Sequence, residues 1–528
     1  MLRVRQINVN VLEDSKEKLI EKCAKKLGIK KDEILNIKIK KQSLDARKKP
    51  DLFYSYEIDV LVKNETTVLA KSKTNDIFKT PDEEYIFNIT GEKKLNNKPI
   101  IIGSGPAGLF CAYMLAKNGY NPIIIERGKD VDNRLVDVEL FWKTGNLNKY
   151  SNVQFGEGGA GTFSDGKLNT LVKDPFNRQR AIFEIFVECG APEEILYVNK
   201  PHIGTDLLRN VVKNIRKKII SMGGEFRFDS CLTNIIYDDN KIKSIEINNS
   251  EIINTEVLVL AIGHSARDTF KMLYENKINM NSKPFAVGIR IQHPQQMINK
   301  SQYGVENHSI LGSASYKLTH KASTGRGVYT FCMCPGGYVV NSSSEENMLA
   351  INGMSNHKRD SENANSAVIV TISKEDFGEH PLDGIEFQRN LESKAFKIAD
   401  GKIPVQLYGD FKNNVISNKF GSVNPIFKGE YKFANIRDIF SKSIVDSLIE
   451  GIDAFDKKIK GFSRDDAIIA GIESRTSSPI RIERDEFCES SIKGIYPCGE
   501  GAGYAGGITS AAMDGVLVAE CIAKKYKN

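Results

Sequence analysis

Pro99-Ile-Ile-Ile-Gly-Ser-Gly-Pro-Ala-Gly108, continued by Asn121-Pro-Ile-Ile-Ile-Glu126, is the stretch that decides the fold. A short apolar run passes through a glycine turn into a helical run, and a second apolar run then stops at an acidic residue. A buried strand, a tight turn, a helix and a second strand in this order form a βαβ unit. The stretch therefore predicts an α/β domain of the Rossmann type, built on a parallel sheet.

The three glycines of this turn have separate tasks in a dinucleotide site. Gly103 permits the tight turn, Gly105 lets the backbone approach a diphosphate, and Gly108 lets the helix pack closely on the sheet. The free N–H groups and partial positive charge at the helix start attract phosphate. The turn is completed by Ser104, Pro106 and Ala107, which we also expect at the cofactor.

The acid that ends the second strand narrows the choice of dinucleotide. Glu126 stands 18 residues after Gly108, close to the roughly 20 expected of the carboxylate that binds an adenosine ribose. A carboxylate in this place repels a ribose phosphate, so NADP is disfavoured and NAD or FAD remains. Arg127 follows directly and is expected beside the same ribose.

The far end of the chain favours FAD. The apolar run 494–498 stops at Gly499-Glu500, and Gly506-Gly507-Ile508 then leads toward a final helix expected from Val516 to about Lys525. A second glycine-fronted helix start exceeds what NAD needs and suits the ribityl chain and flavin of FAD. We expect Glu500 at the ribityl hydroxyls and the amides of 506–508 at the flavin pyrimidine edge, where negative charge develops on reduction.

Three further motifs carry a resemblance to known flavoproteins. They are the run 256–260 with Ala261-Ile262-Gly263 behind it, Val153-Gln-Phe-Gly-Glu-Gly-Gly-Ala-Gly-Thr-Phe-Ser-Asp-Gly-Lys-Leu168, and Arg475-Thr-Ser-Ser-Pro479. The order of the segments 103–126, 261–263 and 498–510 along the chain resembles the glutathione-reductase-like class of NAD(P)/FAD-dependent oxidoreductases. More narrowly, the segments 153–168, 263–268 and 475–479 are similar to a bacterial family of FAD-dependent dehydrogenases without an assigned substrate, and the similarity spans essentially the whole chain. It implies further flavin neighbours at Arg134, Gly159, Ala160, Thr162 and Ser164, and an adenine contact at Leu232.

Changes in periodicity divide the chain into four segments. Residues 1–95 read as a small basic β-α-β-β unit with a ferredoxin-like look, carrying 21 Lys and Arg against 16 Asp and Glu. Residues 96–283 hold the first part of the Rossmann-type FAD domain, and 486–528 complete it. Between them, 284–485 read as an inserted α+β cap or substrate domain.

Composition excludes several classes of protein. The chain has 528 residues, of which 41% are hydrophobic and 27% charged, as in ordinary globular proteins. We find no apolar run of about 18 residues and no secretory leader, so we expect a cytoplasmic protein that does not enter a membrane. The nine cysteines are scattered and odd in number, which suits a reducing compartment, and the seven histidines show no metal-ligand spacing.

The glycine-rich loop 156–167 is the candidate for the reactive edge of the flavin. Its glycines permit close backbone approach to a flat ring, and Ser164, Asp165 and Lys167 are suited to proton transfer. The alternative is a surface turn. The sequence singles out no catalytic residue.

Five more side chains have a functional and a structural interpretation. Cys332 and Cys334 do not match the C-x-x-C spacing of dithiol oxidoreductases, so a buried pair is favoured over a redox pair. His264 is interpreted as a turn cap or a proton-transfer group. Arg290 and Arg475 are interpreted as ligands of an anionic substrate or as members of structural ion pairs.

These observations predict an FAD-dependent oxidoreductase that transfers hydride between a small organic substrate and flavin N5. Because no second glycine motif follows a strand, any NAD(P)H would bind transiently as electron donor, without its own Rossmann domain. An RNA-associated flavoprotein and a flavin sensor without turnover are the alternatives. Nucleic acid is disfavoured because few aromatic residues lie among the basic residues of 1–95, and that segment is the expected surface for a protein partner or self-association.

Overall fold

The stretch 99–126 folds into the predicted βαβ unit. In the computed structural model, which describes residues 1–72 and 74–528, β6 (Ile100–Ile102) turns into α3 (Pro106–Lys117) and continues to β7 (Ile123–Ile125). Both strands belong to a parallel sheet of order β25-β12-β6-β7-β8. Its other strands are β8 (Glu225–Arg227), β12 (Leu258–Leu260) and β25 (Ile495–Pro497). The Rossmann-type α/β fold is therefore confirmed.

The two faces of this sheet are covered differently, as the alternation of its strands requires. Ile101 and Ile124 point into a core shared with four helices, whereas Ile100 and Ile102 point into a core shared with a small antiparallel sheet. The helices are α3, α5 (Arg178–Glu188), α6 (Thr205–Ser221) and α13 (Ile508–Lys525). The small sheet contains β9 (Leu232–Asp238), β10 (Lys241–Ile247) and β11 (Glu251–Asn254).

The last helix begins earlier than predicted. α13 starts at Ile508 instead of Val516, so Gly515 lies inside the helix and does not interrupt it. A Cβ at Gly515 would stand 2.2 Å from the carbonyl oxygen of Ala107, which shows that this glycine allows α13 to pack directly against α3. The early start also brings the N-terminus of α13 close to that of α3.

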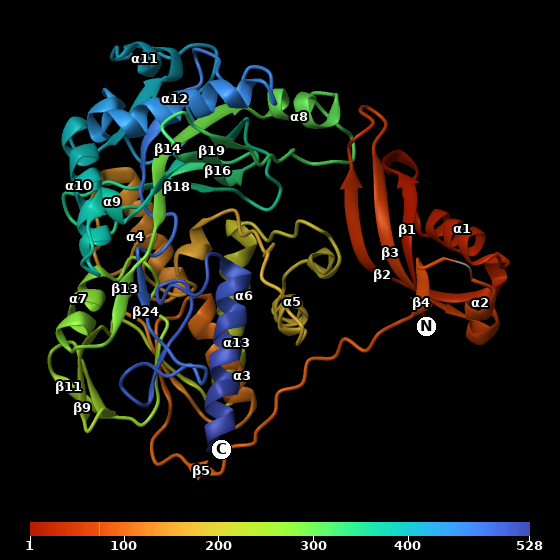
Figure 1. Cartoon of the computed structure of the whole chain (residues 1–528), viewed down its shortest axis with the longest axis horizontal. Helices are drawn as coiled ribbons and strands as arrows, with labels where there is room; N and C mark the ends of the chain where they lie inside the picture. The colour runs from red at the N-terminus through yellow and green to blue at the C-terminus, as the bar shows by residue number, and fades with distance from the viewer. Residues whose placement is uncertain (73) are drawn as a thin grey trace.

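The segment after β12 forms a second layer, the cap, above the Rossmann helices (Figure 1). The chain leaves through α7 (Arg267–Glu275) and β13 (Met280–Ser282) and returns through β24 (Ile480–Ile482), which pairs with β13. Between them lies a seven-stranded sheet of order β15-β16-β19-β14-β23-β20-β22. Its strands are β14 (Phe285–Pro294), β15 (Thr319–Lys321), β16 (Gly327–Cys334), β19 (Asn363–Ile372), β20 (Ile403–Leu407), β22 (Tyr431–Phe433) and β23 (Ile468–Glu473).

Helices and a smaller sheet complete the cap. The predicted helical runs 385–399 and 439–455 correspond to α10 (Asp383–Ile398) and α12 (Lys442–Asp456). The other helices are α8 (Gln295–Tyr303), α9 (Lys374–Phe377) and α11 (Tyr408–Asn413). A three-stranded sheet joins β17 (Tyr338–Asn341), β18 (Ile351–Met354) and β21 (Phe427–Lys428).

The N-terminal residues fold into a separate four-stranded antiparallel sheet with its own core (Figure 1, red). Its order, β2-β3-β1-β4, and its βαββαβ connection are those of a split βαβ unit, with α2 and β4 added to the predicted β-α-β-β run. The elements are β1 (Leu2–Asn10), α1 (Lys16–Leu27), β2 (Ile34–Asp45), β3 (Phe53–Val62), α2 (Glu65–Lys71) and β4 (Ile77–Lys79).

The basic strand β2 of this unit contacts the main body. Gln42 exchanges backbone hydrogen bonds with Tyr197 and Asn199, and Lys49 Nζ donates to the carbonyl of Ser301. An extended segment then returns to the main body, where β5 (Lys93–Lys94) pairs with β26 (Tyr526–Lys527). Among the described residues, no helix combines the length and the apolar character that crossing a bilayer requires.

Candidate functional site

A cavity of about 530 Å³ runs between the Rossmann-type domain and the cap. The turn after β6 and the N-terminus of α13, which are about 400 residues apart in sequence, both line it. The predicted residues that line this cavity are Gly103, Gly105, Pro106, Ala107, Glu126, Arg127, Gly159, Ala160, Ser164, Leu232, Ala261, Ile262, Gly263, Glu500, Gly506, Gly507 and Ile508. Most of the predicted site residues therefore surround one space.

The backbone of the first turn has the form that a diphosphate cradle requires. Gly103 has φ of +97°, and a Cβ there would lie 2.3 Å from the carbonyl oxygen of Ala261. At Gly105 a Cβ would meet only Gly159 Cα at 3.8 Å, so this wall of the cavity is open and consists of bare backbone. With the N-terminus of α3 behind it, the turn fits the phosphates of FAD.

The carboxylate of Glu126 is held in place at the end of β7. It accepts hydrogen bonds from Ser104 N at 2.9 Å and Ser104 Oγ at 2.7 Å, and from the backbone N–H groups of Gly128 and Gly156 at 3.0 and 3.1 Å. The side chain is buried but lines the cavity. This arrangement fixes a negative charge where the ribose hydroxyls of FAD would bind.

The other end of the predicted cofactor site lies at α13. Gly507 caps this helix without a side-chain hydrogen bond, so backbone N–H groups of its first turn remain available to a ligand. Thr509 Oγ1 donates to the carbonyl of Leu168 at 2.6 Å, which ties the helix start to the glycine-rich loop. Nearby, Glu500 Oε1 lies 3.4 Å from His264 Nδ1. These groups suit the ribityl chain and the pyrimidine edge of a flavin.

Five predicted cofactor residues do not line the cavity: Ser104, Gly108, Arg134, Thr162 and Gly499. Ser104 holds Glu126, and a Cβ at Gly108 would meet the carbonyl oxygen of Gly103 at 1.9 Å. A Cβ at Gly499 would lie 2.6 Å from that of Ala107. Thr162 donates to the carbonyl of Glu157 and accepts from Thr205. These residues support the lining of the cavity from behind.

Arg134, which we expect as a flavin neighbour, does not line the cavity. The Arg134 side chain is fully buried, and it donates to the carbonyls of a single loop at distances of 2.7–3.2 Å. The acceptors are Asn152, Val153, Gly156, Glu157 and Gly159. Arg134 therefore holds the glycine-rich loop against the Rossmann-type domain.

Replacing Arg134 with lysine is expected to loosen this loop. Lysine keeps the charge but supplies at most three donors for the five carbonyls, so we expect a loss of about 1–3 kcal/mol in the free energy of unfolding. Limited proteolysis should show faster cleavage within 150–165. Arg180→Lys, in an exposed i,i+4 pair with Glu184, is the control, and equal proteolysis of the two variants would contradict this role.

The cap end of the cavity holds charged groups. The carboxylate of Asp165 accepts two hydrogen bonds from the guanidinium of Arg359 and lies 3.0 Å from Lys167 Nζ. Burial raises the pKa of Asp165, but Lys167 and Arg359 outweigh burial, and the pKa lies below its usual value. The carboxylate therefore stays ionised.

Arg290 and Arg475 both belong to structural ion pairs, and Arg475 also lines the cavity. Arg290 pairs with Glu473, and Arg475 pairs with Glu392. Sequence reasoning missed the lining residues Lys200, Ser315, Tyr316, Lys317, Thr330, Asn352 and Arg359. They come from loops and from the strands β16 and β18, and no sequence motif contains them. Within residues 1–72 and 74–528, no group of His, Cys, Asp and Glu is arranged to hold a metal ion.

Comparison with known proteins gives matches to three family models. Residues 284–476 match "FAD-dependent protein, C-terminal domain-like", residues 101–132 match an NAD(P)-binding Rossmann-like domain, and residues 1–61 match a domain of unknown function. A protein of Clostridium beijerinckii, described as uncharacterized, is 50% identical over 531 residues, which cover 99% of each chain.

Solved structures with a similar fold are more distant. Glycine oxidase from Bacillus cereus is 12% identical with a TM-score of 0.36, covering 81% of this chain and 96% of its own. Glycerol-3-phosphate dehydrogenase from Bacillus halodurans, complexed with FAD, is 12% identical with a TM-score of 0.33, covering 80% of this chain and 64% of its own.

Proposed function

The chain belongs to a family of FAD-dependent oxidoreductase-like flavoproteins, and from this premise we propose that it transfers hydride between a small organic substrate and flavin N5. The observation that carries the proposal is the single cavity lined by both glycine-fronted helix starts and by the cap sheet. FAD, when bound, supplies the two-electron chemistry, and the protein supplies binding, orientation and electrostatics.

The residues of the chain divide this work along the cavity. The turn 103–108 and Glu126 would hold the adenosine and diphosphate end of FAD, and the N-terminus of α13 would face the flavin end, since all of them line one cavity. The cap supplies the opposite wall through Thr330, Phe331 and Asn352, which leaves a space for a substrate. Asp165 and Lys167, which lie 3.0 Å apart, line the same cavity and are the candidates for proton transfer to a group bound there.

The proposal also concerns the electron donor. Any NAD(P)H would enter the cavity transiently, because we find one glycine-rich βαβ unit within residues 1–72 and 74–528, and FAD would occupy it. We expect anaerobic mixing of the purified protein with NADH or NADPH to bleach the visible flavin absorbance, and an added oxidant to restore it. The measurement is stopped-flow absorbance.

The outcomes of this experiment separate two questions. If neither nucleotide bleaches a flavin that dithionite reduces, the nicotinamide donor is wrong. If the dithionite-reduced flavin is also not reoxidised by ferricyanide or a quinone, the oxidoreductase proposal fails and a sensor without turnover is favoured.

A further inference from the structure

The cap strand β16 carries a bulge at the cavity. Its pairing with β19 shifts register between Phe331 and Cys334, and Cys332 has φ of +42°. A non-glycine residue in this conformation is strained and persists only where its surroundings hold it, and bulges re-aim side chains at functional sites. Here the bulge places Cys332 in the cavity lining, with Cys334 fully buried behind it.

Arg290 fixes the backbone of this bulge. Two nitrogens of its fully buried guanidinium donate to the carbonyl of Cys332 at 3.2 and 3.3 Å. Glu473 anchors the same guanidinium at 2.8 Å, and the side-chain oxygens of Asn352 and Asn365 accept from it at 3.1 and 2.6 Å. The conformation of Cys332 is therefore held by several buried hydrogen bonds.

The charges around the two sulfurs make them unequal. The pKa of Cys332 is lowered to about 5, mainly by its hydrogen bond with Cys334 and then by the positive charges of Lys167 and Arg290. These effects outweigh burial and the negative charge of Asp165, which raise the pKa. The hydrogen bond to Cys332 raises the pKa of Cys334, and burial raises it further. Glu473 also faces Cys332 but is compensated by Arg290. Cys332, which lines the cavity, is thus the more acidic of the two thiols, and Cys334 lies behind it.

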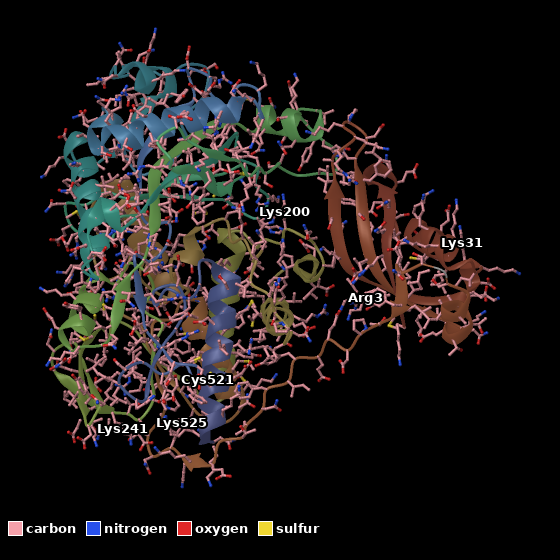
Figure 2. The ribbon with its side chains drawn as sticks, in the orientation of Figure 1. Arg3, Lys31, Lys200, Lys241, Cys521 and Lys525 are labelled. Carbon is pink, nitrogen blue, oxygen red and sulfur yellow. The ribbon has the colours of Figure 1, made fainter. Side chains whose placement is uncertain are left out.

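The surrounding lining indicates a ligand with negative charge. Four basic side chains line the cavity: Lys167, Lys200, Lys317 and Arg359. The carboxylate of Asp165 pairs with two of them, Lys167 and Arg359. Lys200 lies between the cap sheet and the helices α5 and α6 (Figure 2). Tyr316 also lines the cavity with 7% exposure, and its hydroxyl has no hydrogen-bond partner in the described part of the chain. Such a buried polar group is satisfied when a ligand binds.

We propose that Cys332 and Cys334 form a thiol–disulfide exchange pair for a small disulfide that carries carboxylate groups. The Cys332 thiolate attacks one sulfur of the disulfide, forms a mixed disulfide and releases one thiolate. Cys334 then passes its proton to the thiolate released in the cavity, and its sulfur displaces the second thiolate, so an internal disulfide forms. Two electrons pass from the two cysteines to the small disulfide, which leaves as one thiol and one thiolate.

This inference deepens the proposed function by naming a substrate class, and it rests on that function only for the identity of the cavity as the substrate site. The test uses the full-length flavoprotein in a Cys231→Ser background, because Cys231 is also partly exposed. The probe is dithiobis(nitrobenzoate), a disulfide with two carboxylates. We expect rapid release of two equivalents of nitrothiobenzoate from this protein, one from the Cys334→Ser variant, and none at this rate from Cys332→Ser.

Three further measurements make the test decisive. Intact-mass spectrometry should show an internal disulfide in the parent and a stable adduct at Cys332 in Cys334→Ser. The rate at Cys332 should stay nearly constant from pH 8 to 6, whereas an ordinary thiol slows about tenfold per pH unit below its pKa of about 8.5. Lys200→Ala should slow the reaction of the protein with the anionic probe more than its reaction with dipyridyl disulfide, which carries no carboxylate.

The exchange pair is refuted if Cys332→Ser reacts as fast as the parent, or if the parent releases one equivalent and keeps the adduct. FAD content reports whether each variant is folded. Release of nitrothiobenzoate does not require reduction of the flavin, so a negative result in this assay does not contradict the proposed hydride transfer. Conversely, a flavin that NADH and NADPH do not reduce does not contradict the proposed thiol–disulfide exchange.

Discussion

Glutamate in place of Gly105 is expected to give a colourless protein that no longer holds FAD. The side chain has room at its base, since a Cβ at this position would meet only Gly159 Cα at 3.8 Å. Its carboxylate, however, would extend from the cavity wall toward the diphosphate. Juxtaposed like charges cost several kcal/mol, so we expect an affinity for FAD lower by about 100-fold or more. The flavin-to-protein absorbance ratio of the purified variant measures this loss.

Gly105→Ala is the matched control because it adds the Cβ without the charge. We expect this variant to keep the yellow colour and near-parental FAD content. If alanine removes FAD as completely as glutamate, close contact at Gly105 and not phosphate charge is the determinant. If Gly105→Glu stays yellow, the turn 103–108 does not hold the diphosphate.

A second large effect is expected at Glu392, in the junction between cap and Rossmann-type domain. This fully buried carboxylate accepts hydrogen bonds from Arg267 of α7 at 2.8 Å, from Arg475 at 2.9 and 3.0 Å, and from Ser474 at 2.6 Å. Glu392→Gln keeps the shape but leaves the guanidinium of Arg475 without its compensating charge and that of Arg267 with Glu345 alone. We expect the free energy of unfolding to fall by about 3–5 kcal/mol, measured by urea unfolding.

The acid dependence of this effect has a defined sign. Burial raises the pKa of Glu392, but Arg267 and Arg475 outweigh burial, so the pKa in the folded protein lies below its usual value. The carboxylate therefore stabilises the fold above its unfolded pKa of about 4.3, and this stabilisation is lost as the pH falls through the lower, folded pKa. The difference between parent and Glu392→Gln should be constant near neutrality and narrow below about pH 4.

Glu386→Gln is the control on the same helix. Glu386 pairs with Arg389 at 2.8 Å, but its side chain is 65% exposed, and exposed pairs contribute only about 0–1 kcal/mol. Equal losses in the two variants would contradict the assignment of Glu392 as the buried junction.

The fold and the cofactor end of the site could be predicted because their signals are local. Gly103, Gly105 and Glu126 belong to one βαβ unit, in which each residue type follows from a backbone conformation or a nearby charge. Arg134 shows the limit of this reasoning. Its place near the glycine-rich loop suggested a flavin contact, but the sequence does not say which side of a loop an arginine packs against.

The cap end of the cavity could not be predicted for a different reason. Tyr316, Asn352 and Arg359 come together only because the loop before β15, the strand β18 and the loop after β18 pack in three dimensions, and their spacing in sequence has no period. The start of α13 was missed because Gly515 resembles a helix breaker. Its function, close contact with α3, depends on a partner about 400 residues away.

The pairing of β13 with β24 has a consequence for how such a protein can diversify. The chain leaves the Rossmann-type domain through β13 and returns to it through the neighbouring strand β24. The roughly 200 residues between these strands are therefore an insertion that does not alter the path of the chain through the cofactor-binding fold. A lineage can therefore exchange or remodel this module and acquire a new chemical preference while inheriting the nucleotide site unchanged. The module brings its own hydrophobic core, so the recipient has to reproduce little more than the two paired strands and Arg267, whose acceptor Glu392 belongs to the module.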